Sequence, residues 1–292
     1  MAPQGHHHGH DGDGGDAVFD FAEAAPRFRA RADAETPRYR RLAAALTGPG
    51  TRTAADIGCG AASMAFALAE TLPGVHVTAV DAEPAMLDLV RERAAERGTP
   101  MPTALASIDD PDALAALPRV DFAWAGHVVH HAADPQAALR NLAALLNPGG
   151  RLAIGEGGTA PQFLPANLGT GRPGLELRLI EAGARRLADE LAAHGGTPLP
   201  YGWNLALEHA GLVNVHTVND LVAKPAPLAG ADLDHALDSL AARVEWFTHH
   251  LDDADRDTWA RLLDRDGPDW LGHRRDLHHL AIDTVYTAEK PA

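Results

Sequence analysis

The chain is poor in cysteine, in lysine and in long apolar runs, and each shortage excludes a class of protein. Its 292 residues include a single cysteine, Cys59, which excludes an internal disulfide framework and a cysteine-cluster metal site. Only Lys224 and Lys290 are lysines, and the formal net charge of -15 argues against binding to a nucleic-acid backbone. No run of about eighteen apolar residues predicts a membrane span. We therefore expect neither a nucleic-acid partner nor a membrane partner.

The N-terminus lacks the basic and apolar regions of a signal peptide, so a cytoplasmic location is expected. Residues 1–16 are almost entirely glycine, histidine and aspartate, a composition that predicts a disordered tail. The tail residues able to chelate a divalent metal are His6, His7, His8, His10, Asp11 and Asp13. The low-complexity composition favours adventitious metal binding, and no intrinsic metal site is predicted.

From residue 53 onward, strand patterns alternate with helix patterns. The predicted strands cover residues 53–57, 75–80, 103–108, 120–125 and 151–154, and the helices between them cover 61–71, 84–97 and 134–146. The "NPGG" at 147–150 predicts a helix stop and a tight turn. This alternation indicates an α/β protein with a parallel sheet and helices on both faces.

The later segments break this alternation and suggest the domain organisation. We predict a tail (1–16), an N-terminal helical cap (17–52), a core (53–158), a helical insertion over the substrate (159–204) and a completion of the sheet (205–292), which carries a second helical insertion (227–270). The expected fold is a Rossmann-like, doubly wound, mostly parallel seven-stranded sheet with an antiparallel edge strand, an N-terminal helical lid and helical insertions.

A glycine turn in "TAADIGCGAASM" (53–64) predicts where a nucleotide binds. Gly58 and Gly60 follow a buried strand, as in dinucleotide-binding turns, but Asp56 precedes them closely. Pyrophosphate is disfavoured beside a carboxylate, whereas S-adenosylmethionine carries an ammonium and a sulfonium and is compatible with one. Asp81, at the end of the second strand, has the spacing of an acid that binds ribose; alternatively it caps the helix that starts at Pro84.

The segment "SIDD" after the third strand offers contacts to a base. Ile108 is placed to pack on adenine, and Asp109 to accept a hydrogen bond from its exocyclic amine. Asp109 and Asp110 are equally compatible with being solvated loop acids.

Four segments together indicate a family: "ADIGCG" (55–60), "VTAVDAEPAML" (77–87), "VDFAWAGHVVHH" (120–131) and "LLNPGGRLAIGE" (145–156). The chain resembles the class I S-adenosylmethionine-dependent methyltransferases, especially the branch that includes the ubiquinone and menaquinone C-methyltransferases and small-molecule enzymes. Ala62 departs from the glycine usual in the first motif. The cofactor contacts expected from the resemblance and the motifs are Asp56, Gly58, Cys59, Gly60, Asp81, Ala82, Met86, Ile108, Asp109, Gly126 and His127. For Cys59, a small buried filler is the favoured role, not a nucleophile.

The segment "GHVVHH" (126–131) supplies candidates for removing a proton from the methyl acceptor. If the chain is helical here, His127, His130 and His131 share one face by their i, i+3 and i+4 spacing. We predict His127 or His131 as a general base, because histidine titrates near neutrality. A metal site, or histidines that only cap and pack the loop, are the alternatives.

The acceptor pocket is expected between the N-terminal helices and the late insertions. Its candidate walls are Phe19, Phe28, Trp203 and Trp246, each of which is also compatible with core packing. The sequence therefore predicts a monomeric or homodimeric enzyme that transfers a methyl group from S-adenosylmethionine to an oxygen, nitrogen or carbon of a small molecule of bacterial secondary metabolism, with S-adenosylhomocysteine as product. The alternative is a protein of the same fold and cofactor with non-transfer chemistry such as cyclisation. A nicotinamide oxidoreductase and a metal-binding regulatory protein are less favoured.

Overall fold

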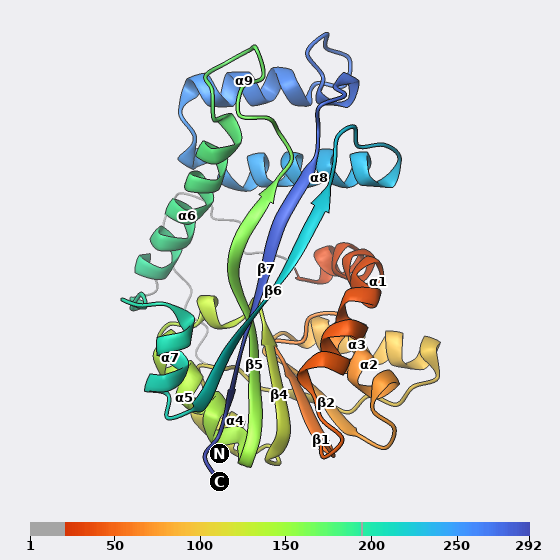
Figure 1. Ribbon diagram of the computed structural model, residues 1–292, viewed down its shortest axis with the longest axis vertical. Coiled ribbons are helices and arrows are strands. Elements are labelled where there is room, and N and C mark those ends of the chain that lie inside the picture. The colour runs from red at the N-terminus through yellow and green to blue at the C-terminus, as the bar shows by residue number, and fades with distance from the viewer. Residues whose placement is uncertain (1–20, 194) are drawn as a thin grey trace, which may run out of the picture.

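A computed structural model describes residues 21–193 and 195–292 (Figure 1). The histidine-rich tail and Phe19 lie outside the described residues. The described chain contains a seven-stranded sheet in the order β3-β2-β1-β4-β5-β7-β6. Its strands are β1 (Thr53–Ile57), β2 (His76–Asp81), β3 (Thr103–Leu105), β4 (Val120–Gly126), β5 (Leu146–Gln162), β6 (Val213–Lys224) and β7 (His279–Glu289).

The mostly parallel sheet predicted from the sequence is confirmed. Strands β1 to β5 pair in parallel, whereas β7 runs antiparallel to both of its neighbours. The antiparallel strand β7 is the second strand from one edge of the sheet. It pairs with β5 on one side and with the outermost strand β6 on the other.

Helices cover both faces of the sheet. They are α1 (Phe21–Leu46), α2 (Ser63–Thr71), α3 (Pro84–Arg97), α4 (Pro111–Ala115), α5 (Pro135–Leu145), α6 (Leu175–Ala193), α7 (Trp203–His209), α8 (Ala231–Phe247) and α9 (Asp253–Leu263), with single 3-10 turns η1 (Val129–His131), η2 (Thr248–His250) and η3 (Leu271–His273). Residues of α1, α2 and α3 form the core on one face, and residues of α4, α5 and α7 form it on the other. The fold is therefore doubly wound.

Local chemistry explains where two of the central helices begin and end. The side chain of Asp134 accepts a hydrogen bond from the amide of Ala137 and caps α5, whose first residue is Pro135. Helix α3 also begins with a proline and ends at Gly98, which adopts the left-handed conformation that favours glycine.

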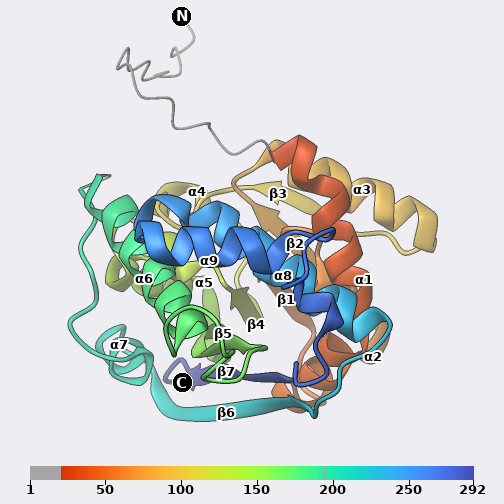
Figure 2. The ribbon, with the colours of Figure 1, turned by 90° about the horizontal axis from the view of Figure 1, so that it is seen from above.

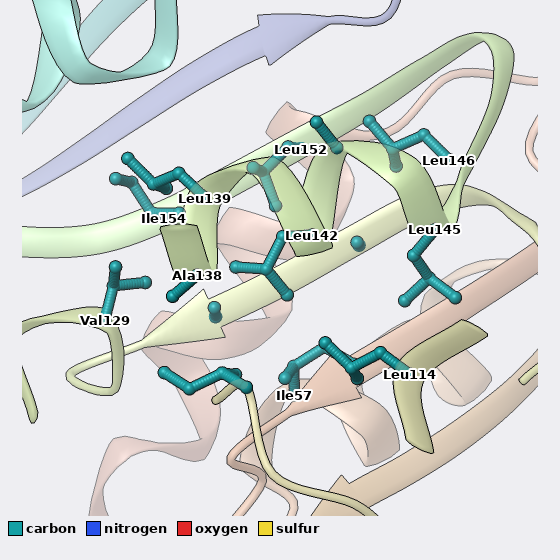
Figure 3. Packing of buried hydrophobic residues seen from close by; sticks show 14 of the residues in the cluster. Ile57, Leu114, Val129, Ala138, Leu139, Leu142, Leu145, Leu146, Leu152 and Ile154 are labelled. Atoms are coloured by element: carbon teal, nitrogen blue, oxygen red, sulfur yellow. The ribbon is translucent and has the colours of Figure 1, made fainter. Parts of the chain in front are cut away.

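The core between α5 and the sheet consists mainly of branched aliphatic side chains (Figure 3). Leu139 and Leu142 of α5 are fully buried, as are Leu152 and Ile154 of β5. Burying one such side chain contributes about 1.5–3 kcal/mol. This cluster fixes the spacing between β4, β5 and the helix and thereby holds the carboxyl ends of both strands in place.

Strand β5 differs from the sequence prediction in two respects. The residues of "NPGG" follow the end of α5, as predicted, but they lie inside β5 at an irregularity where pairing with β4 shifts from Val120–Leu146 to Phe122–Arg151, so the turn is part of the strand. The strand also continues to Gln162, because its distal part pairs with β7. A local pattern does not show a partner more than a hundred residues away. The third strand is shorter than predicted and ends at Leu105.

The two helical insertions pack together as one layer. Side chains of α6, α8 and α9 share a hydrophobic cluster that includes Phe163, Leu179, Leu240 and the fully buried Trp259. In Figures 1 and 2, α8 and α9 lie above the ends of the shorter strands, beyond which β5, β6 and β7 extend. Within the described ranges, every helix is too short or too polar to cross a bilayer.

Candidate functional site

The site lies at the carboxyl ends of β1 and β4, which are neighbours in the sheet. From β1 the chain continues to β2 and β3 on one side, while β4 and β5 lie on the other. Ligands of open α/β sheets bind at such a reversal of strand order. The glycine turn follows β1, Asp81 ends β2, and Gly126 ends β4, so the sheet brings several of the predicted cofactor residues to one edge.

The glycine turn uses three left-handed residues, at alternate positions. Gly58, Gly60 and Ala62 have φ angles of 61°, 49° and 57°. Ala62 stands at the N-cap of α2, so the residue that departs from the family pattern occupies a position where glycine is favoured. A left-handed alanine costs roughly 1–2 kcal/mol.

Three amides of the turn already have acceptors within the protein. The amide of Cys59 donates to the carbonyl of Val80 at 2.9 Å, and that of Ala62 donates to the carbonyl of Cys59 at 2.7 Å. The amide of Gly60 donates to Oδ2 of Asp81 at 2.8 Å. A turn that cradles pyrophosphate keeps such amides free for phosphate oxygens. Here their positive ends are used internally.

Two buried carboxylates lie beneath the turn. Asp56 is 3% exposed and accepts a hydrogen bond from the amide of Ala65 at 2.9 Å. Burial raises the pKa of Asp56 to about 8, and the nearby charge of Asp81 adds to the increase. Oδ1 of Asp81 accepts from the amide of Glu83 at 2.9 Å. The N-cap position of α3 belongs to Glu83, not to Asp81, so the structural alternative for Asp81 is wrong in detail.

The two glycines have different surroundings. A β-carbon at Gly58 would lie 2.3 Å from Cγ2 of Val128, so the turn and the loop after β4 are in close contact there. At Gly60 a β-carbon would meet only Cδ1 of Phe28, at 3.9 Å. Phe28 of α1, predicted as an acceptor wall, therefore lies over the glycine turn. Glycine at this position leaves only the space of a β-carbon between the backbone of the turn and the Phe28 ring.

The remaining predicted cofactor residues are divided between surface and core. Ala82 is exposed, whereas Met86 is 1% exposed and Ile108 is packed in the core. Burial raises the pKa of the Cys59 thiol, helped by Asp56 and Asp81, which fits a protonated buried filler.

The loop acids after β3 have local partners. Oδ1 of Asp109 accepts a hydrogen bond from the amide of Ala133 at 3.2 Å. Asp110 caps α4 by accepting from the amides of Asp112 and Ala113. Asp110 thus serves as a helix cap, and the predicted contact with adenine rests on Asp109.

The histidines after β4 do not share a helix face, so that prediction is wrong. His127 adopts a left-handed φ of 57° and donates its amide to the carbonyl of Gly155 at 2.8 Å. Only residues Val129–His131 form a helical turn, of the 3-10 type. The rings of His130 and His131 pack with centroids 3.9 Å apart. The pairing of β4 with β5 sets this geometry, which spacing along the chain does not reveal.

Desolvation lowers the pKa values of His127 and His131. For His127 the positive charge of Arg31 adds to this effect, and for His131 the charge of His130 does. The shifts favour neutral imidazoles near pH 7.

Glu156 is a site residue that the sequence analysis missed. Its side chain is 2% exposed, and Oε1 accepts from the amides of Val128 at 3.0 Å and Val129 at 2.8 Å. Oε2 lies 2.7 Å from Nδ1 of His130. The available signal was its place at the end of a buried strand, the same pattern that identified Asp81.

The predicted tryptophans occupy different environments. Trp203 lies near Gly157, one residue after Glu156, because a β-carbon there would be 3.7 Å from the indole ring. Trp246 of α8 is 50% exposed. No group of three or more metal-ligating side chains occurs within residues 21–193 and 195–292.

Comparison with known proteins shows a domain match to part of the chain. Residues 55–152 match the family described as methyltransferase domain. Ubiquinone biosynthesis O-methyltransferase of Xylella fastidiosa (strain 9a5c) is 32% identical over 163 residues, which cover 54% of this chain and 59% of that protein. The corresponding enzyme of Xanthomonas axonopodis pv. citri (strain 306) is 31% identical over 117 residues, covering 40% of this chain and 47% of that protein. The chain thus matches about half the length of these relatives.

Solved structures agree on the fold. The YcgJ protein of Bacillus subtilis superposes with a TM-score of 0.52 at 16% identity and covers 87% of this chain and 98% of its own. A protein of Bacillus halodurans C-125, assigned as a methyltransferase, gives a TM-score of 0.51 at 14% identity and covers 89% of this chain and 100% of its own. At such identities the likeness concerns the fold, which confirms the Rossmann-like architecture.

Proposed function

We propose that this chain, whose residues 55–152 match a methyltransferase domain, is a class I S-adenosylmethionine-dependent methyltransferase that transfers a methyl group to a small organic acceptor. The observation that carries the proposal is the chemistry of the glycine turn. The amides of Cys59, Gly60 and Ala62 are used within the protein, and the carboxylate of Asp81 lies against the turn, with the protonated carboxyl of Asp56 buried beneath it. Such a turn is unsuited to pyrophosphate and suits a cationic nucleoside.

The residues present fit S-adenosylmethionine, which when bound supplies a methyl group on a positively charged sulfur. Asp81 would accept hydrogen bonds from ribose hydroxyls through the remaining lone pairs of its carboxylate. Because Gly60 carries no side chain, the nucleoside would approach the backbone of the turn there. Gly126 and His127, across the strand reversal, would hold the amino-acid end. Asp109 would accept from the base amine.

The acceptor side is proposed to lie between α1 and the layer of α6, α8 and α9, which is built from chain outside the matched segment 55–152. Because this layer lies outside the matched domain, it supports an acceptor particular to this protein, in keeping with bacterial secondary metabolism. The names of the relatives, ubiquinone biosynthesis O-methyltransferases, support oxygen as the accepting atom. Methyl transfer to a hydroxyl requires alignment and removal of a proton, and the histidines of the loop at 127–131 are the candidates for the latter.

Calorimetry tests the cofactor assignment. Purified protein is titrated with S-adenosylmethionine, S-adenosylhomocysteine and NAD, and the first two are expected to bind while NAD gives no heat. Asp81→Asn should weaken binding of both by roughly 10- to 100-fold, because it removes a charged hydrogen-bond acceptor worth about 1.5–3 kcal/mol. Asp257→Asn, an exposed site on α9, is the control and should bind as wild type does. Binding of NAD, or wild-type affinity in Asp81→Asn, would contradict the proposal.

A further inference from the structure

Glu156 and His130 form a pair that the methyltransferase assignment does not by itself require. The Glu156 carboxylate is buried, and in the described part of the chain no arginine or lysine forms an ion pair with it. Two backbone amides hold one oxygen, and Nδ1 of His130 lies 2.7 Å from the other. The His130 side chain is 26% exposed, whereas that of Glu156 is 2% exposed. The imidazole thus stands between a buried acid and the surface.

This geometry selects one tautomer of the ring. A carboxylate only accepts hydrogen bonds, so the proton of neutral His130 is on Nδ1 and the lone pair is on Nε2. The amides of Val128 and Val129 fix the orientation of the carboxylate independently of the ring. If Nε2 takes up a proton, the imidazolium forms an ion pair with Glu156. A carboxylate that orients a histidine and compensates its charge is the arrangement of a general base.

The pair is also attached to the place where the methyl donor is proposed to bind. Glu156 holds the amide of Val128, and the side chain of Val128 packs on Gly58 so closely that a β-carbon there would lie 2.3 Å from Cγ2. One carboxylate therefore positions both the residue against the glycine turn and the histidine two positions later. The loop after β4 thereby connects His130 to the glycine turn.

We propose that His130, with Glu156 as its positioning residue, is the general base for a phenolic hydroxyl acceptor; this rests on the proposed function. The acceptor oxygen forms a bond to the methyl carbon as the carbon–sulfur bond breaks, and the sulfur leaves with that electron pair as a neutral thioether. The hydroxyl proton passes to Nε2 of His130 and then to solvent. An imidazole is matched to hydroxyls with a pKa near 10, as in phenols, and amines that are already unprotonated need no such base.

Kinetics with two variants and one control test the pair. Mono- and dihydroxybenzenes and primary arylamines are incubated with S-adenosylmethionine and scored by mass spectrometry. Methylation of at least one phenol is expected. With it, His130→Gln should lower kcat at pH 7 by 100-fold or more, with activity recovering as pH rises toward ionisation of the phenol. The control is His76→Gln. His76 is exposed at the amino end of β2, whereas the site lies at the carboxyl ends of the strands, so kcat should stay within threefold of wild type.

Glu156→Gln is the sharper variant because its shape is preserved. The amide oxygen still accepts from both backbone amides, but its NH2 group donates to Nδ1 of His130 and moves the ring proton to Nε2. We expect kcat to fall at least tenfold with little change in KM, and nitrogen-resolved NMR of the histidine rings should show the tautomer change. A purely structural carboxylate would leave the tautomer and the pH profile unaltered.

The outcomes separate this inference from the proposed function. Calorimetry should show that both variants bind S-adenosylmethionine as wild type does. If wild type binds it but methylates no phenol, or if His130→Gln keeps wild-type kcat across the pH range, the base assignment is overturned and the cofactor assignment stands. If wild type does not bind S-adenosylmethionine, the proposed function itself fails.

Discussion

The buried carboxyl of Asp56 makes the stability of the protein depend on pH in a defined direction. Its pKa rises from 3.8 to about 8 on folding. Between these values the folded state keeps a proton that the unfolded state has released, so the folded state binds more protons and the free energy of unfolding falls as pH rises. At about 1.4 kcal/mol per pKa unit, the loss approaches roughly 5 kcal/mol by pH 8.

Substitution of Asp56 by asparagine removes this titration while preserving shape. The asparagine oxygen still accepts from the amide of Ala65, which Asp56 contacts at 2.9 Å. We therefore expect Asp56→Asn to be more stable than wild type by about 1.5 kcal/mol at pH 5 and by roughly 5 kcal/mol at pH 8.

Urea unfolding at pH 5, 6, 7 and 8, followed by the fluorescence of the five tryptophans, measures this difference. Asp257→Asn, at an exposed position, controls for the loss of one acidic group and should follow wild type. Parallel stability profiles for wild type and Asp56→Asn would refute the argument, because they would mean that Asp56 ionises alike in both states.

Other substitutions test the glycine turn, the contacts of Arg93 beside it and the N-cap of α5. Gly58→Ala should lower stability by 2 kcal/mol or more, because its methyl group would overlap Val128, whereas Gly60→Ala should cost only about 1 kcal/mol yet weaken S-adenosylmethionine binding at least tenfold; equal effects of the two on stability would contradict the difference in packing. Arg93→Met should cost about 1–3 kcal/mol in urea unfolding, because it removes the ion pair with the half-exposed Asp33 and leaves the carbonyl of Ala61 in the turn without its donor; a neutral result would show that these contacts are dispensable. Asp134→Ala should cost about 1 kcal/mol through loss of the α5 cap, and thermal unfolding with an unchanged midpoint would exclude that contribution.

Local signals sufficed for much of the architecture. Helix α3 begins at the predicted Pro84 and ends at the predicted Arg97, because a proline start and a glycine stop are encoded within the segment itself. The order of strands and helices, together with the acid and glycines of the first motif, was enough to predict a doubly wound sheet. The predicted family is supported by the domain match over residues 55–152.

Contacts between distant segments were not available from the sequence. Local periodicity ended β5 at residue 154, but pairing with β7 extends it to Gln162. The two late insertions were predicted separately, yet one hydrophobic cluster unites them. Spacing along the chain suggested a helical face for the histidines after β4. In the structure His127 has a left-handed backbone conformation, which does not continue a right-handed helix.

By itself, then, the sequence determined the sheet, the turn and the acids that end its strands, because each depends on neighbouring residues. Only the tertiary structure decided that the amides of Cys59, Gly60 and Ala62 are already hydrogen-bonded and that His130 meets Glu156. The latter two residues are 26 positions apart and come together because β4 and β5 pair in parallel up to Gly126 and Gly155, just before the two residues. Hydrogen bonds across strands depend on register, and register is fixed by the packing of the whole sheet.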